Sequence, residues 1–265
     1  MKLLAPAKIN LGLSIERKLA DGYHQVSLVN CQVSLFDEIR LKTNSQAKIP
    51  FGQKNTVVKA LKLLGKDFNV QINKNIPVGS GLGGGSSDAA QVLKQFKRLD
   101  LAPKVGMDVA YAGLGGVKLE KQGSVKGSRF TVLPDLPDCY LVICVPKKQL
   151  KTKWAYQQID KMKLKPTSLE LLVKAIKNRD LPAIAQNLTN DFSGLAKKIC
   201  PEINQIQQCL LDTGALGVSI SGKGPAVFGI FKTKKLAADV AHNLQRQYPQ
   251  TYLVKPLKEN YVYQG

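Results

Sequence analysis

The sequence predicts an α+β fold with two domains, and three observations carry this prediction. Strand-like and helix-like patterns are intermixed along the 265 residues, without the strict alternation of a doubly wound sheet. Residues 140–146, YLVICVP, form a continuous apolar run of strand length. The lysine-rich stretch 147–166 that follows is a plausible junction. We therefore expect one domain over residues 1–146 and a second over residues 147–265.

In the first domain, alternating apolar residues predict strands and apolar residues at helical spacing predict helices. Asp-Gly is a strong turn signal, and Asn55 is placed to cap a helix. The expected elements, in chain order, are a strand at 9–15, a turn at 20–24, one or two strands at 25–42, a helix at 55–64, a strand at 69–73 and a helix from Ser86.

The second domain shows the same mixture of patterns. Helical spacing dominates its first part, and strand-like runs then flank a glycine-containing turn, SGKGP at 221–225. The expected elements are helices at 167–178, 181–190 and 202–212, strands at 219–220 and 226–231, a helix at 234–247 and a strand near 252–255.

The formal charge of +20 predicts attraction to anions such as nucleic acid, membrane surfaces or phosphorylated metabolites. Of the 39 basic residues 33 are lysine and 6 are arginine, and the lysines are spread along the chain. Nucleic-acid sites usually cluster their basic residues, so this pattern favours a solvated lysine surface and leaves nucleic-acid binding as an alternative.

Composition also bears on location. No apolar run approaches the roughly 18–20 residues that span a bilayer, and the N-terminus lacks the sustained apolar core of a secretion signal. The five cysteines include no Cys-x-x-Cys pair, so reduced thiols fit better than disulfides or a zinc site. We therefore expect a cytoplasmic protein.

The glycine-rich stretch 77–90, PVGSGLGGGSSDAA, predicts a phosphate site. Glycines free the backbone N–H groups to face an anion, and the helix that follows adds the positive end of its dipole. A merely flexible loop is the alternative. The stretch also matches G-x-G-x-x-G at 79, 81 and 84, but the residues before Asp100 look helical, which argues against a dinucleotide unit. The Walker pattern is absent.

Three segments together resemble the GHMP kinase superfamily: PAKINLGLSI at 6–15, the glycine stretch at 77–90 and GALGVSISGKGPAVFGIF at 214–231. The resemblance implies a two-domain GHMP kinase fold, with an N-terminal ATP-binding domain of ribosomal-protein-S5-like type and a C-terminal ferredoxin-like α+β domain. The active site would lie in the cleft between them and use ATP and Mg²⁺.

The turn DGYH at 21–24, with NDF at 190–192 and CPEI at 200–203, is similar to one branch of the superfamily. That branch phosphorylates the 2-hydroxyl of a methylerythritol carrying a diphosphocytidyl group, in the non-mevalonate route to isoprenoid (terpenoid) precursors. The implied partner is a small cytidylyl substrate, with no nucleic acid and no membrane, and the protein would be a monomer or homodimer. Homoserine, galactose or mevalonate remain alternative acceptors.

The resemblance also implies roles for individual residues. Asp108 in GMDVAYAGLGG would be the catalytic base, and Lys8 in PAKIN would lie beside it. The residues implied in substrate binding are Asn10, Tyr23, His24, Thr152 and Tyr156, the last four of which would bind or flank the cytosine. Those implied in nucleotide binding are Asn55, Pro77, Gly79, Gly81, Gly83, Gly84, Gly85, Ser86, Ser87, Gly222 and Gly224.

The sequence departs from the family pattern in several places. The segment between the glycine-loop helix and Asp108 is short by about a helix, and the segment between Lys42 and Asn55 is also short. Ala110 replaces a proline, and Lys223 stands where serine or threonine is common. An additional lysine beside the phosphates would strengthen nucleotide binding or alter specificity.

Overall fold

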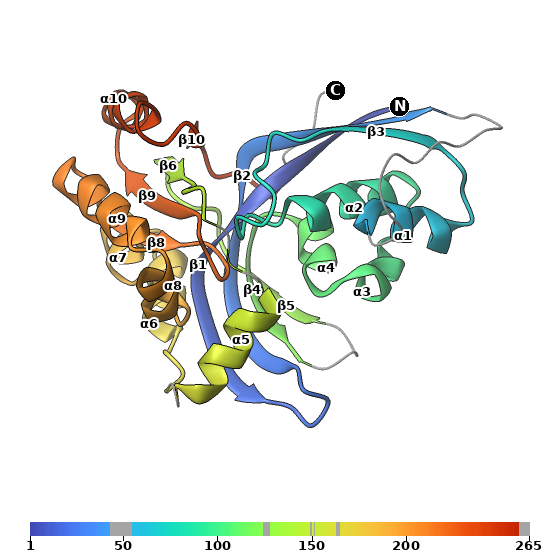
Figure 1. Cartoon of the computed structure of the whole chain (residues 1–265), viewed down its shortest axis with the longest axis horizontal. Coiled ribbons are helices and arrows are strands. Elements are labelled where there is room, and N and C mark those ends of the chain that lie inside the picture. Colours follow the sequence, from blue (N-terminus) through green and yellow to red (C-terminus); the bar gives the residue numbers. More distant parts are fainter. Residues whose placement is uncertain (43–54, 124–127, 149, 151, 163–164, 260–265) are drawn as a thin grey trace.

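The computed structural model describes residues 1–42, 55–123, 128–148, 150, 152–162 and 165–259, with only the helical backbone at 152 and 153. Two β-sheets form its centre, and helices pack on the outer side of each (Figure 1). Strands and helices are intermixed along the chain, so the predicted α+β class is confirmed.

The first sheet is built on two unusually long antiparallel strands, β1 (Lys2–Lys18) and β2 (His24–Lys42). Its strand order is β5-β4-β2-β1-β7, and β3 also pairs with β2. Register shifts interrupt the β1–β2 ladder between Pro6 and Ala7 and between Asn10 and Gly12, and such bulges re-aim side chains locally. The remaining strands are β3 (Asn69–Asn73), β4 (Val117–Gln122), β5 (Ser128–Val132) and β7 (Thr189–Asn190).

Helices of the N-terminal half cover one side of this sheet (Figure 1). The predicted cap at Asn55 is confirmed, because its side chain accepts a hydrogen bond from the backbone N–H of Val57 at 2.8 Å. The helices are α1 (Thr56–Leu64), α2 (Gly84–Gln95), α3 (Ala102–Val105), which follows a 3-10 turn (Leu99–Leu101), and α4 (Met107–Leu114). The four-residue α3 accounts for the short segment before Asp108.

The second sheet has the order β10-β6-β9-β8. The apolar run YLVICVP supplies β6 (Tyr140–Cys144), which lies inside this sheet as its pattern predicts, although it precedes the expected domain boundary at residue 146. The other strands are β8 (Gly217–Ile220), β9 (Val227–Phe231) and β10 (Thr251–Val254). The helices are α5 (Thr152–Lys161), α6 (Glu170–Lys177), α7 (Leu181–Gln186), α8 (Ser193–Ile199), α9 (Glu202–Asp212) and α10 (Lys234–Gln245).

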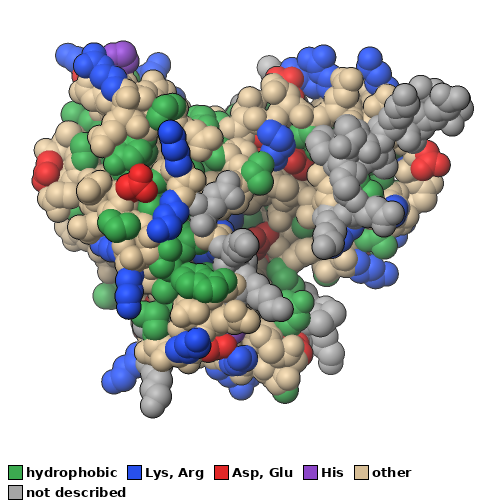
Figure 2. All heavy atoms as spheres, viewed as in Figure 1, with side chains coloured by type: hydrophobic (Ala, Val, Ile, Leu, Met, Phe, Trp, Pro, Cys, Tyr) green, Lys and Arg blue, Asp and Glu red, His purple; other side chains and the backbone are tan. Residues whose placement is uncertain are grey.

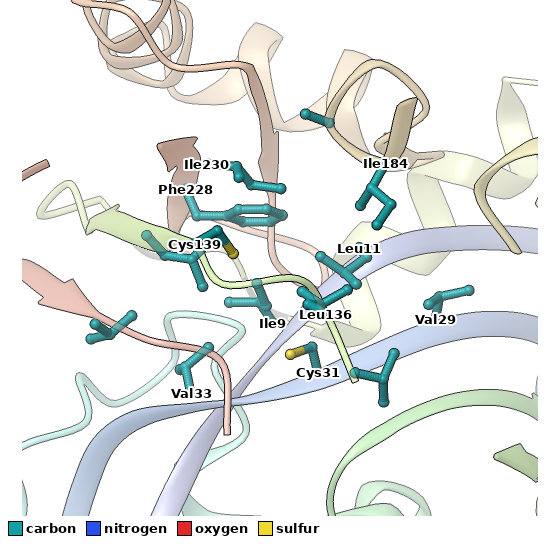
Figure 3. Packing of buried hydrophobic residues seen from close by; sticks show 14 of the residues in the cluster. Ile9, Leu11, Val29, Cys31, Val33, Leu136, Cys139, Ile184, Phe228 and Ile230 are labelled. Atoms are coloured by element: carbon teal, nitrogen blue, oxygen red, sulfur yellow. The ribbon is translucent and has the colours of Figure 1, made fainter. Parts of the chain in front are cut away.

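The largest hydrophobic core joins the two sheets (Figure 3). Ile9 and Leu11 of β1 point into it, together with Phe228 and Ile230 of β9. Because side chains alternate along a strand, Lys8 and Asn10 point to the opposite face of β1. The burial of alternate apolar residues therefore places two polar side chains under the glycine loop.

The surface is rich in lysine without a dense patch on the face in Figure 2, where Lys and Arg side chains are scattered over both halves. The same view shows the molecule hollowed between the part that carries α10 and the part that carries α1 to α4. Among the described residues, no helix combines the length and the apolar character that a bilayer crossing requires.

Candidate active site

A cavity of about 520 Å³ lies where the glycine loop, β1, α4 and α5 meet. It brings together segments that are far apart in the sequence, since its wall includes Lys8, Asp108, Tyr156 and Lys223. The sequence-predicted residues that line it are Lys8, Asn10, Asn55, Pro77, Gly79, Gly81, Gly83, Gly84, Gly85, Ser86, Asp108, Tyr156 and Gly222.

Two glycine-containing loops dock against each other at the roof of this cavity. Gly81 has φ +90°, and a Cβ atom added to it would lie 2.1 Å from the carbonyl oxygen of Ser221. The Ser221 hydroxyl donates to the carbonyl of Gly81 at 2.9 Å, and the N–H of Gly222 donates to Oδ1 of Asn10 at 2.6 Å. Only glycine permits this approach at position 81, so the two loops form one continuous cradle.

The start of α2 faces the same cavity. Gly83 is the N-cap residue with φ +73°, and no side chain caps the helix. The first N–H groups of a helix lack internal partners, so this end offers donors and a positive dipole to an anion. Ser86 lines the cavity, whereas Ser87 turns into the interior and is 1% exposed. The geometry fits a phosphate chain beside residues 79–86.

Lys8 is a buried cation at the floor of the cavity. Its Nζ donates to Oδ1 of Asn10 at 2.5 Å, and its backbone N–H donates to the carbonyl of Leu82 at 2.9 Å. Burial lowers the pKa of Lys8, while the carboxylates of Asp108 and Glu120 act in the opposite direction. A buried ammonium between carboxylates can stabilise the charge of a transferring phosphoryl group.

Asp108 is the second residue of α4, and its carboxylate lines the cavity that holds Lys8. Its Oδ1 accepts a hydrogen bond from Nε2 of Gln122 at 3.1 Å. Gln122 also lines the cavity. A carboxylate fixed at the edge of a phosphate site, close to a lysine, is suited to take a proton from a bound hydroxyl.

Sequence reasoning did not single out Lys74 and Asp88, which also line the cavity. The Lys74 ammonium bridges the carboxylates of Asp37 and Asp88. Burial raises the pKa of Asp88 to about 7, with Lys74 acting in the opposite direction. The only local signal is that Asp88 lies in the glycine stretch and that Lys74 precedes it by three residues. Lys74 follows β3 and Asp88 belongs to α2, so their pairing depends on the tertiary structure.

Lys223 adds a third lysine to the cavity wall. Its Nζ donates to the carbonyl of Gly79 at 3.2 Å, which ties the second loop to the first. The pKa of Lys223 is lowered, first by burial and then by the charge of Lys8. Another quoted motif, NDF, supports the same loop, because Nδ2 of Asn190 donates to the carbonyl of Gly222 at 2.9 Å.

Aromatic side chains form one wall of the cavity. Tyr156 packs edge-on against Phe192, with ring centroids 5.0 Å apart, and both residues line the cavity. His24 lies behind them: it stacks on Tyr156 at 4.8 Å and its Nε2 pairs with Asp160 at 2.6 Å. The wall therefore presents one tyrosine face that is held in place from behind.

Several predicted residues are not in the lining. Tyr23 lies on the β1–β2 turn with 58% of its surface exposed, and His24 contacts the cavity only through Tyr156. Gly224 and Ser87 also lie outside the lining. The side chain of Thr152, at the start of α5, is outside the described residues. Their roles in binding stay predictions.

Comparison with known proteins agrees with this arrangement. The family description "GHMP kinases N terminal domain" matches residues 55–116, and "GHMP kinases C terminal" matches residues 172–250. A 4-diphosphocytidyl-2-C-methyl-D-erythritol kinase of Listeria innocua is 30% identical, over 98% of this chain and 97% of its own length. A protein of the same name from Acetivibrio thermocellus is 34% identical, over 89% of this chain and 92% of its own.

Solved structures point the same way. A crystal structure of 4-(cytidine 5'-diphospho)-2C-methyl-D-erythritol kinase superposes with a TM-score of 0.81 at 29% identity, over 97% of this chain and 99% of that one. A crystal structure of L. major mevalonate kinase has a TM-score of 0.68 at 18% identity over 97% of each chain and shows the fold alone. The chain therefore belongs to the GHMP kinase family of ATP-dependent small-molecule kinases, and its full-length similarity is to the 4-diphosphocytidyl-2-C-methyl-D-erythritol kinases within it.

Proposed function

We propose that this enzyme transfers the γ-phosphoryl group of ATP to the 2-hydroxyl of 4-diphosphocytidyl-2-C-methyl-D-erythritol. The observation that carries the proposal is one cavity lined by a phosphate cradle, by Lys8 and Asp108, and by Tyr156. The cradle suits a nucleotide triphosphate, the charged pair suits a hydroxyl acceptor, and the ring offers a surface for a base. The printed name of the full-length relatives supports the same acceptor.

The proposed reaction needs positioning and charge neutralisation more than covalent help. ATP supplies the γ-phosphoryl group, which the acceptor hydroxyl attacks with release of ADP. Asp108 takes the hydroxyl proton, and the Lys8 ammonium stabilises negative charge on the transferring group. Asn10 fixes the Lys8 ammonium through its Oδ1 and holds the second loop through Gly222. Gln122 keeps the Asp108 carboxylate in place.

Magnesium is part of the proposal. Mg²⁺ usually keeps several waters and binds through one or two carboxylates together with substrate phosphates. The described residues include no group of three or more His, Cys, Asp or Glu side chains that could hold a metal by itself. The Ser86 hydroxyl and the Asp88 carboxylate, whose Oδ1 has no hydrogen-bond partner among the described atoms, offer oxygen ligands in the cavity wall. We propose that these two groups hold magnesium when ATP is bound.

A cytoplasmic setting completes the proposal, supported by five free cysteines, four of them buried. The spread of lysines in Figure 2 favours a solvated surface over a nucleic-acid site. Whether the protein is a monomer or a homodimer stays a prediction.

Coupled measurement of ADP release tests the acceptor. We expect turnover with the cytidylyl substrate to exceed turnover with mevalonate, homoserine or galactose by orders of magnitude in kcat/KM. A base that stacks on Tyr156 adds binding energy that the smaller acceptors cannot reach. Equal rates with all four acceptors would contradict the proposed acceptor and would indicate a GHMP kinase of another specificity. ATP titration beside a random oligonucleotide checks the nucleic-acid alternative, which predicts salt-sensitive oligonucleotide binding and no ADP release.

Tyr156→Ala should raise KM for the cytidylyl substrate by roughly 5- to 150-fold, since base–aromatic stacking is worth about 1–3 kcal/mol. KM for ATP should stay within about twofold, because the phosphate cradle is untouched. Tyr156→Phe keeps the ring and should behave like wild type. Trp154→Ala removes an exposed aromatic from the same helix and is the matched control. An unchanged KM in Tyr156→Ala would remove this ring from the substrate site.

A further inference from the structure

A chain of buried hydrogen bonds starts at Lys8 and runs beneath the cavity. Lys8 Nζ donates to Oδ1 of Asn10 at 2.5 Å, and Nδ2 of Asn10 donates to Oδ1 of Asn30 at 2.6 Å. Asn10 and Asn30 are direct cross-strand partners in the β1–β2 ladder. Asn30 Nδ2 then donates to Oε2 of Glu120 at 2.6 Å. Every donor in this chain points from the lysine toward the glutamate, which lets the bonds strengthen one another.

The chain continues from Glu120 to the proposed base. Nε2 of Gln122 donates to Oε1 of Glu120 at 3.0 Å and to Oδ1 of Asp108 at 3.1 Å. An amide nitrogen carries two hydrogens, so Gln122 can serve one carboxylate with each. Glu120 is thus joined to Lys8 through two asparagines and to Asp108 through one glutamine.

Glu120 cannot act on the substrate directly. It is 0% exposed and does not line the cavity. Burial raises its pKa to about 7, Asp108 adds to the increase, and hydrogen bonds to Ser128 and Gln122 oppose it. Burying a carboxylate in this way is costly for stability, and an apolar side chain would fill the site at lower cost. Its connections end at the two proposed catalytic groups, which indicates a role in the site.

We propose that Glu120 is a positioning residue for phosphoryl transfer, holding Asp108 through Gln122 and Lys8 through Asn30 and Asn10. Asn10 also binds the N–H of Gly222, so the same chain reaches the second phosphate loop. This inference rests on the roles proposed above for Lys8 and Asp108. With Oδ1 of Asp108 held by Gln122, Oδ2 is the oxygen assigned to the hydroxyl proton.

Kinetics of Glu120→Gln, Gln122→Leu and the double variant test the connection to Asp108. Each single change should lower kcat with the cytidylyl substrate by about 10- to 100-fold, as expected for a displaced catalytic group, with KM for ATP within about twofold. Because the connection to Asp108 runs through one amide, the double variant should lose less than the product of the two single losses, and its loss beyond that of Gln122→Leu reports the connection of Glu120 to Lys8. Lys121→Gln removes a charge from the exposed face of the same strand and should keep wild-type rates.

Stability and pH separate positioning from ordinary packing. The folded-state pKa of Glu120 is raised from 4.5 to about 7, so the folded form binds more protons over that range. Its contribution to the free energy of unfolding is therefore full below pH 4.5 and is lost as the pH rises toward 7. Glutamine does not titrate, so Glu120→Gln removes this pH-dependent loss of stability. Its free energy of unfolding should therefore fall less between pH 4.5 and pH 8 than that of wild type while its rate is lower, whereas a purely structural residue would leave the rate unchanged.

A measurement without substrate tests the role of Glu120 separately from the proposed function. The lysine ¹³Cε resonance of Lys8, assigned by its absence in Lys8→Met, should titrate at a lower pH in Glu120→Gln than in wild type, because the carboxylate of Glu120 raises the pKa of Lys8. If wild type ignores the cytidylyl substrate but this shift is present, only the proposed acceptor is wrong.

The inference is overturned if wild type is active and Gln122→Leu, whose side chain lies at the cavity edge, matches Lys121→Gln in kcat. It is equally overturned if Lys8 titrates identically in wild type and Glu120→Gln. Should Glu120→Gln fail to fold, the rate of Gln122→Leu decides the inference.

Discussion

Asp108→Asn is expected to lower kcat by roughly 10²- to 10⁴-fold, the range that general-base catalysis contributes. Asparagine keeps the shape of the side chain and an oxygen that can still accept from Gln122. It loses the negative charge and the basic oxygen that receives the hydroxyl proton. KM for ATP should change by less than about threefold, since the proposed nucleotide site consists of residues 79–86 and the loop at 221–224.

Single-turnover measurements at saturating ATP isolate this effect from product release. Asp100→Asn is the control, because Asp100 lies in the 3-10 turn before α3, is exposed and forms a salt bridge with Arg98. A near-normal rate in Asp108→Asn would remove Asp108 from the role of base. It would direct attention to Asp88, another carboxylate in the cavity wall.

Gly81→Ala should abolish measurable ATP binding or weaken it by more than about 100-fold. The added Cβ would meet a backbone carbonyl at 2.1 Å, and backbone cannot move aside as a flexible side chain can. The two loops would separate, and Gly222 would lose its place against Asn10. A positive φ adds a further cost of about 1–2 kcal/mol for any residue with a Cβ.

Titration calorimetry with ATP measures the loss, and Gly65→Ala provides the comparison. Gly65 has φ +59° at the end of α1, with nothing within 4 Å of an added Cβ. It carries the backbone strain without the collision, so its ATP affinity should equal that of wild type. Equal affinities for the two variants would mean that the contact between the loops contributes nothing to nucleotide binding.

Local motifs predicted six of the helices, α1, α2, α6, α7, α9 and α10, but missed α3, α4, α5 and α8, and they predicted the long strands poorly. The cap at Asn55 and the glycine loop before α2 are short-range signals, and both were read correctly. The full lengths of β1 and β2 were not predicted. Buried polar residues such as Asn30 and Gln32 interrupt the apolar alternation, and bulges shift its phase. Strand length here depends on pairing with partners that sequence patterns do not identify.

The candidate site divides in a similar way. Lys8, Asp108 and residues 77–86 belong to motifs and were predicted from them. Glu120 and Gln122 were not, because the segment VKLEKQ at 117–122 has the polar composition of a solvated strand. Their burial follows from the position of β4 beneath α4, and that contact is visible only in three dimensions.

The docking of the two loops also has a consequence during translation of the chain. The bond between Asn10 and Gly222 joins residues 212 positions apart, and Ala226 likewise bonds back to Ser80. A growing chain contains the base, the lysine and the first loop long before the second loop leaves the ribosome. Prematurely released fragments would therefore carry Lys8, Asp108 and the first loop without the second loop that completes the proposed nucleotide site.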